Sequence, residues 1–243
     1  MSSESPPRNK NEQSEPFIMK KNIFTFFICL SFTICANAQI LRAEELEEYA
    51  KEKYGKKWVE AAENLAQTLS LDKNNALTYT QIIEAPNKTK EQLYILINYW
   101  YTATFNSGKA VIQLNDKDAG VIIGKGFIEE IAFHIGGSNK YKVNLEPIIK
   151  TDIKSGKVRI TYTIQFYTVE KMVGSGYFGN KETSIRVDEN WVLYKCYPFV
   201  KKDNHKITSS KALIMAHAYS NVVMDKIEEV VKNGLIGNEN ENW

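Results

Sequence analysis

The sequence has few of the residues that mark disulfide-rich, collagen-like or strongly charged proteins. Its 243 residues include only 3 cysteines, 6 prolines and 13 glycines. Low-complexity linkers therefore cannot form much of the chain, and a collagen-like fold is excluded. Lys and Arg number 31 against 29 Asp and Glu, a formal net charge of +2. Because there is no excess of positive charge, we do not expect nucleic acid as a partner.

Long apolar runs are also lacking, apart from one stretch near the N-terminus. Residues 23–34 are largely apolar, but they are fewer than the roughly 20 that a membrane-spanning helix needs. They follow Met19-Lys20-Lys21 and precede Ala36-Asn37-Ala38. A charged start, an apolar middle and small residues at a cut predict a secretory signal peptide that is cleaved after Ala38, and a membrane anchor is the alternative. We therefore expect an exported protein, periplasmic or secreted, whose translation starts at Met1 or Met19 and whose mature chain has no transmembrane segment.

Cleavage at this position would leave a single cysteine, because Cys29 and Cys35 lie in the predicted signal peptide. No internal disulfide is then possible, so core packing must hold the exported chain together. Cys196 lies in an apolar and aromatic run, which predicts a small buried side chain.

Hydrophobic periodicity predicts an α+β protein. Helical spacing is found in residues 41–70, 88–105 and 209–233, with Asn87 or Thr89 as the cap of the second helix. Strand patterns cover residues 77–84, 110–114, 119–133, 141–153 and 157–169. Gly124, inside one of these patterns, indicates a bulge or a close approach of two parts of the chain.

The clearest pattern is the alternation between residues 157 and 169. Val158, Ile160, Tyr162, Ile164 and Phe166 are predicted to face the core. The opposite face would present the candidate binding residues Arg159, Thr161, Thr163, Gln165 and Tyr167. These side chains offer hydrogen bonds with little charge, which suits contact with a glycan or a protein. The alternative is that the strand is threonine-rich only because threonine favours strands.

Three segments together carry a resemblance to a known family. They are the predicted helix that runs into Lys109-Ala110-Val111-Ile112-Gln113, the stretch Asp116-Lys117-Asp118-Ala119-Gly120 with the following Gly124-Lys125-Gly126, and the hairpin at residues 152–159. Residues 77–169 resemble a large bacterial family of exported proteins, a domain of unknown function with a TATA-binding-protein-like (TBP-like) fold. The resemblance implies a curved antiparallel sheet of about five strands with helices on one face, and it brings no activity or ligand.

These observations together predict the organisation of the chain. We expect a signal peptide with its preceding extension at 1–38, an N-terminal helical segment at 39–76, a TBP-like domain at 77–236 with an insertion at 170–208, and a loose tail at 237–243.

Sequence motifs for catalysis are missing. His134, His205 and His217 are far apart and in no metal-ligand pattern, and no nucleophile elbow occurs. We therefore expect no catalytic residue, metal or cofactor, although an extracytoplasmic hydrolase stays a lesser alternative.

The function that we expect is binding of an unidentified protein or glycan. A second hypothesis is a carrier of a small hydrophobic ligand between sheet and helix, with Trp58, Trp100, Tyr101, Phe105 and Phe166 around the ligand.

Overall fold

The computed structural model describes residues 48, 51–52, 55, 57–105, 111–136, 139–175 and 183–234. The chain divides into two units, Met1–Ala36 and Asn37–Trp243, and all described residues belong to the second. The predicted signal peptide at 1–38 and the predicted tail at 237–243 lie outside the described residues.

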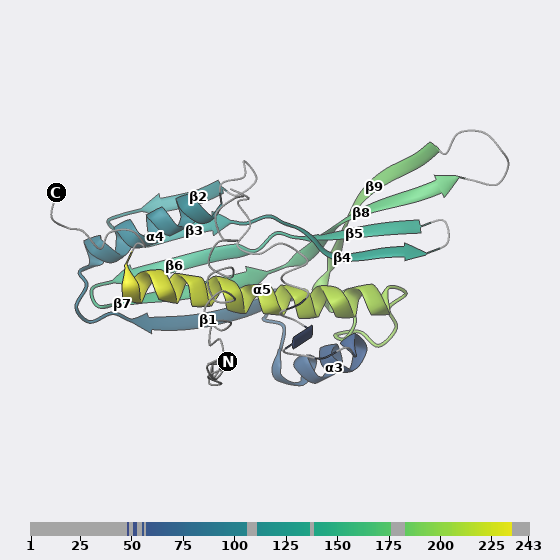
Figure 1. The fold of residues 1–243 in the computed structure, drawn as a ribbon, viewed down its shortest axis with the longest axis horizontal. Coiled ribbons are helices and arrows are strands. Elements are labelled where there is room, and N and C mark those ends of the chain that lie inside the picture. Colours follow the sequence, from purple (N-terminus) through teal and green to yellow (C-terminus); the bar gives the residue numbers. More distant parts are fainter. Residues whose placement is uncertain are drawn as a thin grey trace, which may run out of the picture. The chain divides into compact units, whose positions relative to one another are not determined.

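In the described part of the chain, α3, β1 and α4 come first, and the strands β2 to β9 then follow one another before η1 and the final helix (Figure 1). The helices are α3 (Trp58–Thr68), α4 (Lys90–Thr104), the short 3-10 helix η1 (Leu193–Lys195) and α5 (Lys206–Asn233). The strands are β1 (Leu77–Glu84), β2 (Val111–Asp116), β3 (Val121–Lys125), β4 (Ile128–Gly136), β5 (Asn139–Leu145), β6 (Ile148–Lys154), β7 (Lys157–Ile164), β8 (Phe166–Ser175) and β9 (Thr183–Val192).

The strands form two antiparallel sheets, with the orders β1-β7-β6-β3-β2 and β4-β5-β8-β9. Three runs of chain pass from one sheet into the other, at residues 126–127, 146–147 and 165. The five-stranded antiparallel sheet confirms the predicted fold class. The sequence patterns at 119–133, 141–153 and 157–169 had predicted single strands, whereas each is divided between the two sheets.

Both long helices pack on one side of the strands, as predicted. Helix α4 contacts β6 and β7, while α5 contacts β1, β4 and β7. The side chains that α4 buries recur at helical spacing: Leu93, Leu96, Ile97, Trp100 and Tyr101. Thr89 caps this helix, because its side chain accepts a hydrogen bond from the Gln92 amide while the Gln92 side chain accepts one from the Thr89 amide. This side of the sheets is called the helix side below, and the opposite side the outer face.

Helix α5 runs beneath both sheets (Figure 1) and is longer than the predicted 209–233. It begins at Lys206 and ends before Gly234, whose φ of 80° is accessible to glycine at little cost. His217, in the middle of α5, lies 3.0 Å from the Tyr79 hydroxyl of β1 through its Nδ1 atom. This contact gives His217 a structural role, as an interior helix residue tied to the sheet.

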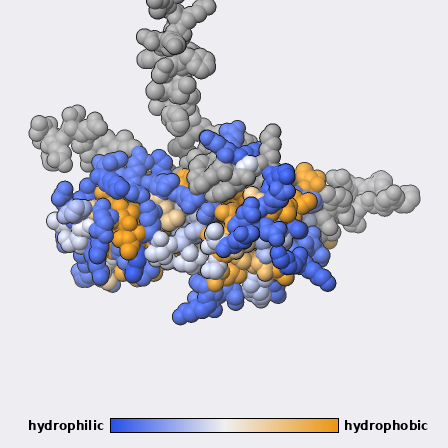
Figure 2. Space-filling model, turned by 90° about the horizontal axis from the view of Figure 1, so that it is seen from below, coloured by the Kyte–Doolittle hydropathy of each residue, from blue (hydrophilic) through white to orange (hydrophobic). Residues whose placement is uncertain are grey.

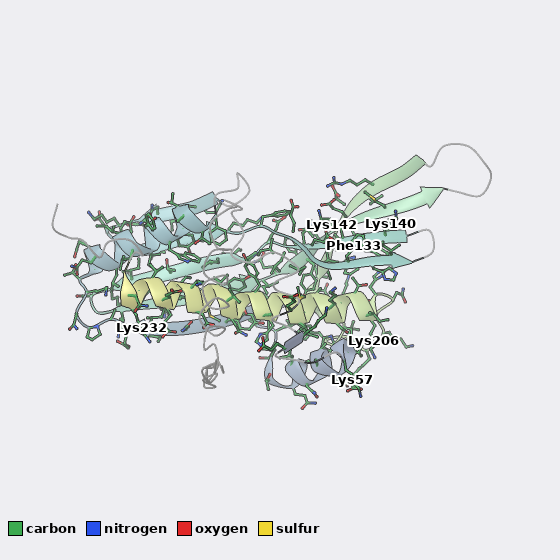
Figure 3. All side chains as sticks on the ribbon, viewed as in Figure 1. Lys57, Phe133, Lys140, Lys142, Lys206 and Lys232 are labelled. Atoms are coloured by element: carbon green, nitrogen blue, oxygen red, sulfur yellow. The ribbon has the colours of Figure 1, made fainter. Side chains whose placement is uncertain are left out.

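Helix α3 is fastened to the segment that precedes α5. The Tyr197 hydroxyl donates to Glu63 Oε2 at 2.9 Å, and Lys201 Nζ lies 3.1 Å from Glu63 Oε1. Lys206, at the start of α5, stands 4.2 Å above the centre of the Tyr197 ring (Figure 3). Helix α3 therefore packs on α5 and the segment before it rather than standing apart.

Strand β7 shows both the strength and the limit of the alternation pattern. Val158, Ile160, Tyr162 and Ile164 are completely buried, as predicted. Gln165 lies between β7 and β8. The chain from β7 to β8 has one residue more than the paired chain from β5 to β6, and this additional residue shifts the alternation by one position. Tyr167 is consequently buried on the helix side, with 1% of its surface exposed, so its predicted place on the outer face is wrong.

The predicted insertion at 170–208 contains ordinary elements of the fold. It comprises most of β8, the edge strand β9, η1 and the start of α5. Cys196 is buried there, and burial, with a smaller effect of the nearby Asp203 charge, raises the pKa of its thiol to about 12. The thiol is therefore protonated at neutral pH, as the prediction of a structural cysteine requires.

Candidate binding surface

The outer face of the five-stranded sheet carries a quartet of threonines from two neighbouring strands. Thr78 and Thr80 of β1 stand directly opposite Thr163 and Thr161 of β7. The Thr78 and Thr163 hydroxyl oxygens are 3.4 Å apart, and Thr78 also donates to Asp72 Oδ2 at 3.1 Å. The hydroxyls form a flat array of hydrogen-bonding groups beside the exposed Ile82. This array is called the threonine quartet below.

A charged triad lies next to the quartet and consists of Lys150, Asp152 and Arg159. Arg159 donates from Nε and Nη2 to Asp152 Oδ2 at 3.0 and 2.8 Å, and Lys150 Nζ lies 2.9 Å from Asp152 Oδ1. Partial burial acts to raise the pKa of the Asp152 carboxyl. The hydrogen bonds and charges of Lys150 and Arg159 outweigh burial, so the pKa is lowered. The Asp152 carboxyl therefore stays ionised at neutral pH, between the two basic side chains.

The structure thus brings together three of the five predicted residues. Arg159, Thr161 and Thr163 share the outer face of β7, and Thr151 of the neighbouring strand is buried on the other side. Gln165 is exposed at the junction between the two sheets. Tyr167 is excluded by its burial, as described above.

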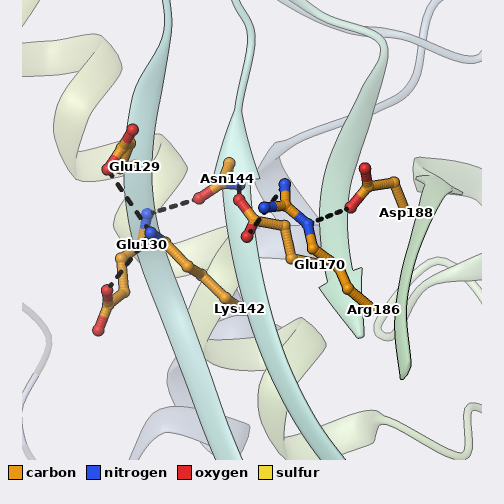
Figure 4. A network of polar contacts seen from close by, with 7 residues as sticks. All are labelled: Glu129, Glu130, Lys142, Asn144, Glu170, Arg186 and Asp188. Carbon is orange, nitrogen blue, oxygen red and sulfur yellow. Dashed lines mark hydrogen bonds and ion pairs between the residues drawn. The ribbon is translucent and has the colours of Figure 1, made fainter. Parts of the chain in front are cut away.

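The outer face of the four-stranded sheet holds a second polar group that the sequence did not reveal (Figure 4). It extends over all four strands and is called the Glu130 network. Its members are Glu129, Glu130, Lys142, Asn144, Glu170, Arg186 and Asp188. Lys142 lies on β5 near Phe133 and Lys140, on the same pair of strands (Figure 3).

Asn144 is the centre of this network, and only 1% of its surface is exposed. Its Oδ1 accepts a hydrogen bond from the Glu130 amide at 2.9 Å, and its Nδ2 donates to Glu170 Oε1 at 3.0 Å. Arg186 continues the chain of contacts, 3.3 Å from Glu170 Oε2 and 3.1 Å from Asp188 Oδ1. Asn144 therefore fixes both a backbone amide and a carboxylate.

Glu130 adopts an unusual backbone conformation, with a φ of 57°. It lies in a bulge of β4, where the register against β5 shifts between Ile128 and Ala132. A left-handed conformation costs a residue with a side chain about 1–2 kcal/mol. Strain of this kind and bulges are both frequent at functional sites. Lys142 stands 3.5 Å from Glu129 and 3.9 Å from Glu130, so the bulge gathers charge at the surface.

The two polar groups belong to one outer face. At the junction of the sheets, Lys125 of β3 is ion-paired with Glu146, and Glu146 accepts a hydrogen bond from the Thr168 hydroxyl at 3.1 Å. Lys125 is the last residue of β3 in the five-stranded sheet, whereas Thr168 lies on β8 in the four-stranded sheet. These contacts join the end of β3 to the outer face of the four-stranded sheet, while Ile148 of β6 stands between Lys125 and Thr163 of the quartet.

The histidines lie elsewhere, on the helix side. His205 stacks on Trp191, with ring centres 4.4 Å apart, and its ring centre lies 4.8 Å from that of Tyr141. His134 is 5.9 Å from the same tyrosine ring. In the described part of the chain, no group of three or more His, Cys, Asp or Glu residues is placed to hold a metal ion.

The space proposed for a hydrophobic ligand is filled by the side chains themselves. The Trp100 ring lies 5.0 Å from Tyr101 and 5.4 Å from Phe105, edge to face in both cases. The Tyr101 hydroxyl donates to the Ile149 carbonyl oxygen at 2.7 Å, directly across the layer between α4 and β6. The Trp58 side chain lies outside the described residues. These contacts favour a packed core over a carrier.

Comparison with known proteins agrees with this fold. Residues 79–172 match a domain family described as a domain of unknown function (DUF4468) with a TBP-like fold. This part of the chain is a DUF4468 domain. The match covers the threonine quartet except Thr78, and the β4, β5 and β8 members of the Glu130 network. It leaves β9 and α5 outside.

Two solved structures are similar to the chain. One is a TBP-like protein from Parabacteroides distasonis, 11% identical, with a TM-score of 0.44 over 66% of this chain and 95% of that one. The other is a DUF4468 family protein from Bacteroides ovatus, 11% identical, with a TM-score of 0.43 over 67% of this chain and 91% of that one. No curated protein matches the chain. None of the helices in the described ranges is long and apolar enough to cross a membrane.

Proposed function

We propose that this protein is an exported, non-catalytic binding protein whose outer face contacts a protein partner. The observation that carries the proposal is that the threonine quartet with its neighbouring charged triad and the Glu130 network lie on the same face, opposite the helices. Helices α4 and α5 both lie on the helix side, so this row of hydroxyls and charges faces away from them.

The composition of the outer face favours a protein over a glycan. Tyr167, the aromatic residue predicted for this face, is buried, so the quartet offers hydroxyls, charges and the exposed Ile82. Such a mixture of hydrogen-bonding and apolar groups on a flat surface is typical of protein interfaces. The Glu130 network holds four carboxylates against the two cations Lys142 and Arg186. Its excess of negative charge does not suit a phosphate backbone.

The N-terminal sequence supports the export part of the proposal. Lys20 and Lys21, the apolar residues 23–34 and Ala36-Asn37-Ala38 supply the three parts of a secretory signal. Mass spectrometry of the protein isolated from its host tests the assignment, with Gln39 expected as the first residue. A cytoplasmic protein that retains residues 20–38 would contradict export.

Site-specific photo-cross-linking tests the binding surface. A photoreactive phenylalanine analogue at Thr161 is expected to link the partner in intact cells, because Thr161 stands between Thr80 of the quartet and Lys150 of the charged triad. The matched control carries the same group at Ile95, which is 63% exposed on α4. A product at Thr161 that is missing at Ile95 supports the proposal. Equal products at both positions, or none at Thr161, would contradict it.

A further inference from the structure

Strand β9 is an edge strand of the four-stranded sheet, with β8 on one side only. Its register against β8 is regular through ten consecutive pairs, from Phe166 with Val192 to Ser175 with Thr183. Residues 185–188 are all exposed. A strand in this position presents main-chain N–H and C=O groups that can pair with a further strand.

Strand β9 lacks several of the usual protections of an edge strand and keeps one, the charged side chains Arg186, Asp188 and Glu189. Its sequence, TSIRVDENWV, has no proline, no glycine and no lysine, and its pairing with β8 is not interrupted by a bulge. The opposite edge of the same sheet, β4, differs because the bulge at Glu130 distorts it. In the part of the chain that the structure describes, the sheet is therefore distorted at its β4 edge and regular at its β9 edge, where no further strand pairs with it.

The side chains of β9 are self-complementary around Val187. When two copies of the strand run antiparallel with Val187 opposite Val187, Arg186 of each copy stands opposite Asp188 of the other. Moving the centre of the pairing to Arg186 or to Asp188, a register shift of two residues, puts Arg186 opposite Arg186 or Asp188 opposite Asp188. Opposite charges in directly facing positions stabilise a strand pair and like charges destabilise it, so charge selects the first register.

The other side of β9 supplies an apolar contact at the two-fold axis. Ile185 and Val187 are 62% and 43% exposed on the helix side, where Val187 pairs with Lys171. In this register the two copies of Val187 meet, and Ile185 of each copy stands opposite Glu189 of the other. The apolar contact on this side is therefore centred on Val187, while the Arg186–Asp188 pairs cover the outer face.

We propose that β9 is a homodimerisation strand, which pairs with β9 of a second copy in the register centred on Val187. Two four-stranded sheets then form one sheet of eight strands. A two-fold axis normal to the sheet leaves both outer faces on the same side, so the two Glu130 networks lie next to each other. The strands supply main-chain hydrogen bonds, and the charges fix the register.

Charge reversal tests the proposal on the full chain, with the molar mass measured by light scattering over a range of concentrations. The wild-type protein is expected to have the mass of two chains of 27.8 kDa each. Arg186→Asp puts like charges in both facing positions and is expected to weaken the dimer roughly 10- to 100-fold. The double variant R186D/D188R restores opposite charges and is expected to restore the dimer.

Either of two results would overturn the proposal. One is a wild-type protein with the mass of a single chain up to about 1 mM, well above the dissociation constants of specific dimers. The other is a dimer whose dissociation constant is unchanged by Arg186→Asp. Circular dichroism of each variant shows that it is folded before its mass is interpreted.

A cysteine cross-link tests the register independently of charge. In a chain with Cys29→Ser and Cys35→Ser, Val187→Cys places two thiols opposite each other, and mild copper-phenanthroline oxidation is expected to form a covalent dimer. The control is Ile185→Cys, whose two copies are four residues apart along the strands, about 13 Å. A covalent dimer that forms equally with both variants, or with neither, contradicts the register.

Discussion

The contact between Gly124 and Tyr101 makes a quantitative prediction about the core. Gly124 of β3 lies beneath the Tyr101 ring of α4, and a Cβ atom added to it would lie 2.5 Å from Cε1 and 2.9 Å from Cδ1 of that ring. Carbon atoms in contact are normally about 3.5–4.0 Å apart, so in Gly124→Ala the ring would have to move by about 1 Å. The sequence-based expectation of a close approach at Gly124 is thereby confirmed.

The ring has little freedom to make this movement. The Tyr101 hydroxyl is hydrogen-bonded to the Ile149 carbonyl oxygen at 2.7 Å, and Trp100 packs on the ring at 5.0 Å. Overpacking in such a core costs about 1–3 kcal/mol, and the fixed ring puts Gly124→Ala near the upper end. A loss of about 2–3 kcal/mol lowers Tm by roughly 4–12 °C in a protein of this size. Urea unfolding followed by tryptophan fluorescence measures the free energy, with an unchanged m-value.

A graded control and a double variant separate this contact from a general effect of glycine replacement. At Gly126 an added Cβ would be 3.2 Å from the Phe105 ring and from Pro147, so Gly126→Ala is expected to cost less than about 1 kcal/mol. In a Tyr101→Leu background, Gly124→Ala is expected to cost less than about 0.5 kcal/mol, because the ring is gone. A free energy of unfolding within about 0.5 kcal/mol of the wild type in Gly124→Ala alone would refute the reasoning.

Three further predictions concern other groups. Asn144→Ala removes the hydrogen bonds to the Glu130 amide and to Glu170 Oε1. It is expected to cost about 1–3 kcal/mol in urea unfolding, and a cost below that of an exposed alanine substitution would contradict the central role of Asn144. The lowered pKa of Asp152 contributes stability above the ordinary carboxyl pKa, which is lost as the pH falls through the folded-state pKa. Asp152→Asn should therefore be less stable than wild type by about 1 kcal/mol at pH 7 and equal to it near pH 2, and a pH-independent difference would be inconsistent with this sign. Cys196 should resist iodoacetamide in the folded protein and react after unfolding, as peptide mass spectrometry would show; rapid labelling of the native state would exclude a protonated, buried thiol.

The fold was predictable where side-chain periodicity is strong and local. Helix α4 follows from its apolar spacing and its Thr89 cap, and β7 follows from strict alternation. The second sheet was not predictable, because periodicity does not mark the points at which a strand leaves one sheet for another. Gln165 is a single additional residue with no turn signal around it, and it alone decides that Tyr167 is buried.

The candidate surface was predictable in part, for the same reason. Arg159, Thr161 and Thr163 lie on one strand, so alternation places them on one face. The Glu130 network depends on pairing among four strands and on a left-handed residue, which only the tertiary structure brings together. Glu129-Glu130 was visible in the sequence as a pair of adjacent acids, but nothing marked the bulge or the buried Asn144 beside it.

The three runs of chain that cross between the sheets bear on how the molecule can be divided. Each of β3–β4, β5–β6 and β7–β8 is one covalent segment that belongs to both sheets. A protease cut or a truncation that removed one sheet would sever strands of the other. Neither half can therefore be transplanted alone, and heat or denaturant should melt both halves in a single step.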